Sequence, residues 1–206
     1  MFKPQAGARR NIGLALALFF VAAAGLSSPA SAEFRNLTDR ELKFGVLKHD
    51  ARFLGGVEGG VDINPQLILA SPIPDLWAAS LPWYLSWMVQ PRPTLGAEIN
   101  TSGFTNQFYF GATWSWQLAS NILQPGDGFT VSYFFGGAAN DGETRPTRPN
   151  RKALGSNILF REALEFGYRI NPVIEISAFI DHVSNAGFAR YNQSINDVGG
   201  RIGFRF

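Results

Sequence analysis

The sequence predicts an all-β protein, an eight-stranded antiparallel up-and-down β-barrel of the transmembrane type. Three observations support this prediction. Segments of roughly ten residues alternate between apolar and polar side chains, which is the length and period of a tilted membrane-spanning strand. Their apolar faces are rich in Phe and Trp, whereas the opposite faces carry Glu, Arg, Asp and Gly. The last strand alternates up to Phe206 and resembles the carboxy-terminal assembly signal of bacterial outer-membrane barrels. A soluble β-sandwich is the competing architecture, but charged inner faces suit a polar lumen better than a sandwich core.

Composition narrows the function classes. The chain has 206 residues, which fits a single domain, and it contains no Cys, which excludes a disulfide scaffold and any thiolate metal site. The formal net charge of +2 gives no argument for binding nucleic acid.

The N-terminal segment has the pattern of a secretory signal peptide. Its first residues are basic, residues 12–24 are apolar, and Ala30-Ser31-Ala32 forms a small-x-small cleavage site. The apolar run is shorter than the roughly 20 residues that a transmembrane helix needs. We therefore expect a cleaved leader over residues 1–32 and a barrel over residues 33–206.

The eight strands are predicted from the alternation and from the turn residues between them. Their predicted ranges are 42–49, 57–70, 94–100, 107–117, 129–137, 160–170, 174–184 and 196–206. With an even number of strands and both chain termini in the periplasm, the connections around 50–56, 101–106, 138–156 and 185–195 are expected on the extracellular side. The periplasmic segment 71–93 contains Trp77, Trp83, Tyr84 and Trp87, which we interpret as a membrane-interface belt rather than a ligand site.

Strand 174–184 ends in an unusual polar pair. Because side chains alternate along a strand, His182 and Ser184 share a face with the apolar residues Ile174, Ile176, Ala178 and Ile180. That face is expected to meet lipid. A histidine and a serine on the lipid-facing wall have little structural use, so they are a candidate base and nucleophile.

A third partner is expected on the last strand. Its lipid-facing set includes Ile202 and Phe206, and extending that phase upward selects Asn196 rather than Asp197. If Ile174 pairs with Phe206, Ser184 and Asn196 lie at the same height on neighbouring strands.

The motif His182-Val-Ser184-Asn185-Ala-Gly187, followed by Asn192 and the strand ending at Phe206, resembles the lipid A 3-O-deacylase (PagL) family. The specific motif covers about the last quarter of the chain. The resemblance implies an eight-stranded outer-membrane barrel that hydrolyses an ester-linked acyl chain of lipid A with a Ser-His-Glu triad on its outer wall. It implies lipid A, or lipopolysaccharide, as the partner in the outer leaflet.

Carried over residue by residue, the resemblance assigns Ser184 as the nucleophile and His182 as the base. Asn185 matches the family's His-x-Ser-Asn pattern, and the Gly187 backbone N–H and Asn192 match the positions expected to hold the oxyanion. Each such donor is typically worth ~3 kcal/mol in acyl transfer.

The sequence departs from the family at the acidic member of the triad, which falls on Asn196. Three alternatives remain open. In the first, Asn196 orients His182 through a neutral hydrogen bond. In the second, a bulge in the last strand brings Asp197 into place. In the third, the enzyme is weak or silent, because an amide cannot stabilise an imidazolium as a carboxylate does. We favour an active or weakly active enzyme, and Asn196→Glu separates the alternatives.

No cofactor and no metal site are expected. The only two histidines are His49 and His182, and neither has a second ligand at metal spacing in the sequence. The inward-facing charges are expected to form a paired network that fills a narrow barrel and leaves no channel: Glu58, Asp62, Arg161, Glu165, Arg169, Glu175, Asp181, Arg201 and Arg205.

Two functions compete at this point. The first is an outer-membrane esterase that acts on lipid A; the second is a non-catalytic structural or adhesin-type barrel with a degenerate site. The sequence leaves open the acyl-chain preference, the regulation of activity, whether the relevant acyl link is an ester or an amide, and the oligomeric state, a homodimer included.

Overall fold

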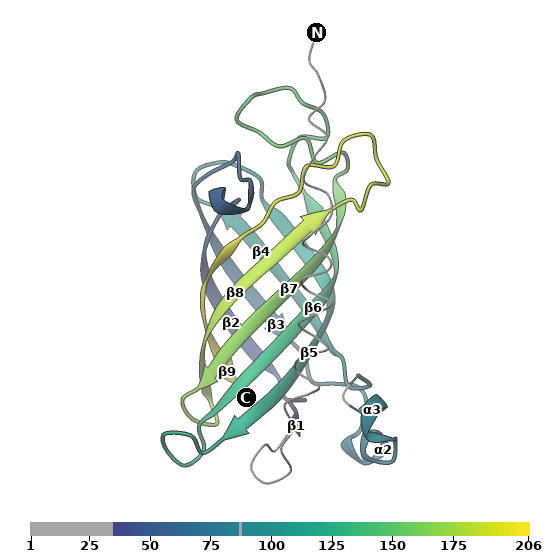
Figure 1. Ribbon diagram of the computed structural model, residues 1–206, viewed down its shortest axis with the longest axis vertical. Helices are drawn as coiled ribbons and strands as arrows, with labels where there is room; N and C mark the ends of the chain where they lie inside the picture. The colour runs from purple at the N-terminus through teal and green to yellow at the C-terminus, as the bar shows by residue number, and fades with distance from the viewer. Residues whose placement is uncertain (1–34, 87) are drawn as a thin grey trace. The chain divides into compact units, whose positions relative to one another are not determined.

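The computed structural model describes residues 35–86 and 88–206, so the expected leader over residues 1–32 lies outside the described residues. Its main feature is one antiparallel sheet that closes on itself (Figure 1). Consecutive strands pair from β2 to β9, and β2 also pairs with β9 to close the barrel. The strands are β2 Glu41–Lys48, β3 Val61–Ile68, β4 Arg92–Asn100, β5 Gln107–Ser120, β6 Gly128–Asn140, β7 Ile158–Arg169, β8 Ile174–Ser184 and β9 Val198–Arg205.

The predicted eight-stranded barrel is confirmed, with small changes at strand ends. A two-residue strand, β1 (Arg35–Asn36), adds to the edge of β5. The largest difference is at the start of β3, where residues 57–60 belong to the preceding loop. The backbone N–H groups of Val57 and Glu58 both donate to Asp50 Oδ2, which holds this stretch out of the sheet.

The connection between β3 and β4 contains two short helices that the alternation pattern does not predict, α2 (Asp75–Ala79) and α3 (Trp83–Ser86). Trp77 on α2 is exposed. Trp87, another member of the expected aromatic belt, lies outside the described residues. A single 3-10 turn, η1 (Arg52–Leu54), lies in the loop between β2 and β3. No helix in the described part of the chain is long and apolar enough to cross a membrane.

Side chains alternate between the two sides of the barrel wall, as predicted. The outward positions are apolar and exposed; Phe44, Phe110 and Ile176 are examples. The inward positions are mostly polar or charged and are buried. An outer wall that presents apolar side chains and a lumen that encloses charged ones is the arrangement of a membrane-spanning barrel.

Ion pairs fill the lumen near the short turns. Lys43, which is 1% exposed, has its Nζ 3.0 Å from Glu165 Oε2, 3.0 Å from Glu175 Oε1 and 3.4 Å from Glu41 Oε1. Arg205 Nη2 is 2.9 Å from Glu175 Oε2. These contacts match the paired network expected from the sequence, because buried charges persist only where opposite charges and hydrogen bonds surround them.

A second buried group lies nearer the long loops. Arg161 donates to Glu98 Oε1 at 2.7 Å and also pairs with Asp181. Its guanidinium lies 4.0 Å from the centre of the Tyr109 ring, and Tyr109 packs edge-on against Phe134. A layer of apolar and aromatic side chains therefore surrounds this ion triad, and side chains fill the barrel as expected for one of this size.

Candidate active site

The end of β8 places His182 and Ser184 on the outer wall. Inward-facing Asp181 and Val183 are buried, whereas His182 and Ser184 between and beyond them are partly exposed. His182 Nε2 lies 3.1 Å from Ser184 Oγ, and His182 Nδ1 lies 2.8 Å from Asn196 Oδ1. The structure therefore brings together the three side chains that the strand phase selects.

The register differs from the one assumed in the sequence analysis. Ile174 pairs with Phe204, not with Phe206, and the pairing continues to a bridge between Val183 and Ile195. A shift of two residues keeps every side chain on its predicted face. It also puts Asn196 directly across from His182 instead of Ser184, which is the position that a partner for the imidazole needs.

These contacts define the chemistry of the imidazole. An amide oxygen can only accept a hydrogen bond, so Nδ1 carries the proton that is donated to Asn196 Oδ1. In the neutral ring Nε2 then carries no proton and can accept a hydrogen bond from the Ser184 hydroxyl, 3.1 Å away. This is the tautomer in which histidine acts as a general base toward serine.

The loop that follows β8 forms a tight turn around Asn185. Ala186 and Gly187 both have positive φ, 53° and 85°, and the Gly187 N–H donates to Asn185 Oδ1 at 2.9 Å. The Asn185 N–H donates to Asn192 Oδ1 at 2.9 Å. Asn185 and Asn192 therefore build the turn beside Ser184. The Gly187 N–H reaches an oxyanion only after it leaves Asn185.

A second loop supports this turn. Asn185 Nδ2 donates to the carbonyl of Leu154 at 2.7 Å. The Ala153 N–H donates to Gln193 Oε1 at 2.6 Å, and the Gln193 N–H returns a bond to the Ala153 carbonyl at 3.1 Å. At Gly155, φ is +80° and a Cβ would lie 1.9 Å from the Tyr191 carbonyl oxygen, so only glycine allows this approach.

Asp197 lies on the other side of the wall. It is fully buried in the lumen, where its Oδ1 accepts the Asp50 N–H at 2.6 Å and lies 3.5 Å from His49 Nδ1. The β8–β9 pairing is continuous through Ile180–Val198 and Val183–Ile195, so the described sheet has no bulge that would turn Asp197 outward. The alternative in which Asp197 orients His182 has no geometric support, because the strand alternation is intact.

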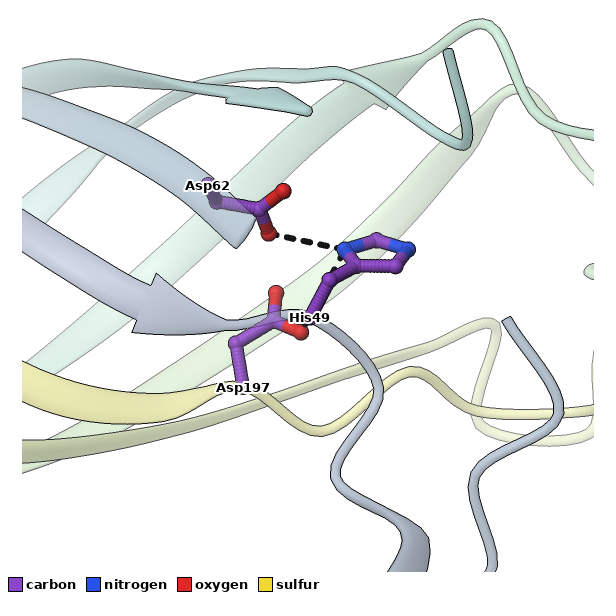
Figure 2. A group of neighbouring side chains, drawn as sticks. All are labelled: His49, Asp62 and Asp197. Carbon is purple, nitrogen blue, oxygen red and sulfur yellow. Dashed lines mark hydrogen bonds and ion pairs between the residues drawn. The ribbon is translucent and has the colours of Figure 1, made fainter. Parts of the chain in front are cut away.

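His49 and three acidic residues form a buried cluster under Asn196. Figure 2 shows the carboxylates of Asp62 and Asp197 beside the His49 ring. His49 Nδ1 lies 2.7 Å from Asp62 Oδ2, and Nε2 lies 3.2 Å from Glu58 Oε2. The Ala51 N–H also donates to the Asn196 carbonyl at 2.8 Å. The cluster and its loop thus hold the backbone on which Asn196 is mounted.

The carboxylates favour the charged form of His49. Burial lowers its pKa, but hydrogen bonds and charge attraction from Asp62 and Glu58 outweigh burial and raise the pKa to about 9. Burial alone would raise the pKa of Glu58; its hydrogen bonds to His49, the Lys152 N–H and Thr105 lower it to about 2. His49 is therefore an imidazolium between carboxylates at neutral pH.

The fold brings together residues of the types that bind metal ions, although their spacing in the sequence does not indicate a metal site. Ligand atoms of His49, Asp62 and Asp197 lie within 4.8 Å of one another, as do those of Glu98, Asp181 and Asp197. Both ring nitrogens of His49 already contact carboxylates, and Arg161 pairs with Glu98 and Asp181. The residues fit a network of ion pairs.

One residue beside the site is absent from the candidates that the sequence motif supplies. Glu162 on β7 pairs directly with His182 on β8, and its side chain is on the outward face between Phe160 and Leu164. The signal was available in the sequence, because Glu162 shares the alternation phase of those two apolar residues.

The fold and the site together define a class: an outer-membrane-type barrel whose outer wall carries the hydrogen-bonded side chains of Asn196, His182 and Ser184. The model of the family described as lipid A 3-O-deacylase (PagL) matches residues 75–205, more than half of the chain. The chain belongs to this family. A comparison of the sequence with curated proteins found no match.

One similar solved structure supports the fold, and two others have lower TM-scores. The crystal structure of the outer membrane enzyme PagL is similar, with a TM-score of 0.55, 15% identity, and coverage of 79% of this chain and 97% of that one. The N-terminal β-barrel domain of Pseudomonas aeruginosa OprF has a TM-score of 0.47 and 10% identity, with 84% and 100% covered. Neisserial surface protein A has a TM-score of 0.44 and 11% identity, with 81% and 96% covered.

Proposed function

We propose that this protein is an esterase of the bacterial outer membrane that removes the 3-O-linked acyl chain of lipid A. The observation that carries the proposal is the hydrogen-bonded series Asn196–His182–Ser184 on the outer wall of a barrel that belongs to the deacylase family. An acyl chain in the outer leaflet reaches such a wall directly. A site on the lumen side would be closed to it by the packed ion pairs.

The first half of the reaction acylates the serine. As Ser184 Oγ attacks the carbonyl carbon of the ester, its proton moves to His182 Nε2. The carbonyl oxygen becomes an oxyanion, which the Asn192 side-chain amide stabilises together with the Gly187 N–H once this N–H has left Asn185. The C–O bond to the sugar then breaks, His182 returns the proton to the departing 3-hydroxyl oxygen, and the acyl group remains on Ser184.

The second half releases the fatty acid. His182 Nε2 takes a proton from water as the water oxygen attacks the acyl carbon. Collapse of the second tetrahedral intermediate breaks the bond to Ser184 Oγ, and His182 returns the proton to that oxygen. An ester suits this site better than an amide, because the amide bond is stabilised by resonance and an alkoxide leaves more readily than an amide anion.

The surroundings of Ser184 fit a substrate with an apolar tail and a charged head. Phe160, which pairs with Ser184, and Phe188, which is 84% exposed, have ring centres 6.0 Å apart on the outer wall. Beside the loops lies a cavity of about 600 Å³ whose lining includes Arg145, Arg190 and Tyr191. Guanidinium groups there suit the phosphates of a lipid A headgroup.

The test is the mass spectrum of lipid A from membranes that contain lipopolysaccharide and the expressed protein. We expect one hydroxyacyl chain to be lost with the wild type and retained with Ser184→Ala. A matched control is Ser177→Ala, which removes a hydroxyl from the same strand but on the lumen side. Unchanged lipid A in the presence of correctly folded wild-type barrel would favour the non-catalytic barrel instead.

A further inference from the structure

Glu162 is the one acidic side chain on the outward face of the described strands β2 to β9. The other outward positions are apolar or aromatic, apart from the site residues on β8 and Lys48 at the loop end of β2. A carboxylate on a lipid-facing surface is costly, so its presence points to a function.

The position of Glu162 connects it to His182. The two residues are directly paired across β7 and β8, which places their Cβ atoms ~5 Å apart on the same face. Asn196 occupies the equivalent place on the other side, in the segment just before β9. His182 thus lies between Asn196 on one side and the strand position of an acidic residue, Glu162, on the other. Glu162 Oε2 also accepts a hydrogen bond from the Tyr133 hydroxyl at 3.4 Å.

The reaction requires a charge that Asn196 lacks. When Ser184 gives its proton to His182, the ring becomes an imidazolium, which a neutral amide orients but does not neutralise. Both ring nitrogens are already hydrogen-bonded, to Asn196 and Ser184, so a carboxylate beside the ring acts through space. Such an interaction is strong on a wall that faces lipid, where solvent screening is weak.

We propose that Glu162 is a positioning residue that stabilises the His182 imidazolium from β7 and so supplies the negative charge that Asn196 does not. This inference rests on the proposed function, since it concerns the base of the same reaction. The acid and the hydrogen-bond acceptor of the triad are thereby divided between two parts of the sheet: Asn196, just before β9, fixes the tautomer, and Glu162 on β7 carries the charge.

A double-mutant cycle tests this division. The four proteins are the wild type, Glu162→Gln, Asn196→Glu, and the variant with both changes. Glu162→Gln should lower the turnover number roughly 10- to 100-fold in the wild-type background, with KM little changed. In the Asn196→Glu background, where a carboxylate already contacts His182, the same change should cost less than about 3-fold.

The cycle is read in two ways so that the substrate and the site are tested separately. One readout is lipid A deacylation. The other is the rate at which a fluorophosphonate probe labels Ser184, which needs the His182 base but no lipid A. Labelling without deacylation in all four proteins would reject lipid A as the substrate while the labelling rates still decide the role of Glu162.

Two controls accompany the cycle. Lys48→Gln removes the other outward charge and should leave both rates unchanged. Glu162→Asp keeps the carboxylate and should retain more activity than Glu162→Gln. Three results would overturn the role of Glu162. They are an equal fall in the turnover number from Glu162→Gln in both backgrounds, an effect on KM alone, and no fall in activity at all. Absence of labelling in every protein would overturn both this role and the esterase proposal.

Discussion

The two histidines lie on opposite sides of the same barrel wall, and their surroundings differ. His49 in the lumen contacts the carboxylates of Asp62 and Glu58 and is fully buried. His182 on the outer wall contacts an amide and a hydroxyl and is partly exposed. The first is a cation within an ion-pair network, which contributes to stability. The second has Nε2 within hydrogen-bond distance of a serine hydroxyl, which is the position required of a base. The same side chain therefore has different roles according to the face it occupies.

The largest expected effect is the loss of activity on replacing His182. His182→Asn removes the base and should lower the deacylation rate ~10⁴-fold, because the serine then has no proton acceptor. Stability should change by less than ~0.5 kcal/mol, since no ion pair is broken. Lipid A turnover and urea unfolding of the purified barrel measure the two quantities. A stable but fully active variant would contradict the assignment of the base.

Breaking an ion pair in the lumen should lower stability and leave turnover nearly unchanged. Arg161→Met leaves the buried carboxylates of Glu98 and Asp181 without their partner and should destabilise the barrel by ~3–5 kcal/mol. Turnover by the protein that remains folded should change little. The urea midpoint and the rate per folded molecule are the measurements. A large fall in turnover at unchanged stability would show that the lumen network serves the reaction directly.

The charge on His49 makes part of the stability depend on pH. Its pKa in the folded protein is raised to about 9, so its contribution is complete below the ordinary value of about 6.5 and is lost as pH rises through 9. A shift of this size corresponds to roughly 3 kcal/mol. Urea unfolding between pH 6 and pH 10 should show this loss in the wild type and not in His49→Asn. Parallel curves for the two proteins would contradict the ion-pair role.

An acid at position 196 should make the surroundings of His182 more like those of His49. Asn196→Glu gives His182 a carboxylate partner like those of His49, and we expect turnover to rise roughly 10-fold. The gain is limited because Glu162 already supplies charge on the other side. Single-turnover deacylation with the wild type and the variant measures it. Lower turnover in a folded variant would indicate that the longer side chain displaces His182 from Ser184.

The smallest expected effect concerns the loops. Arg145→Gln combined with Arg190→Gln removes the cations beside the loop cavity and should raise KM for lipid A a few-fold, without changing the turnover number, because the lining of that cavity does not include His182, Ser184 or Asn196. Kinetics over a range of lipid A concentrations separate the two constants. An unchanged KM would exclude these residues from headgroup recognition.

Much of the fold follows from local pattern. The two-residue period predicts the eight strands, the lumen charges, and the outward placement of His182, Ser184 and Asn196, because alternation is fixed by strand geometry. The start of β3 and the two helices in the β3–β4 connection are not predicted. Asp50 holds residues 57–60 out of the sheet through hydrogen bonds that the alternation does not encode.

What the sequence by itself determined is therefore which side chains face lipid and which face the lumen. Only the tertiary structure decided the register, and with it the direct pairing of His182 with Asn196 and with Glu162. A two-residue slip preserves the alternation but moves every cross-strand neighbour. The same holds for His49, whose carboxylate partners come from β3, from the loop before it and from the segment before β9, and meet only when the barrel closes.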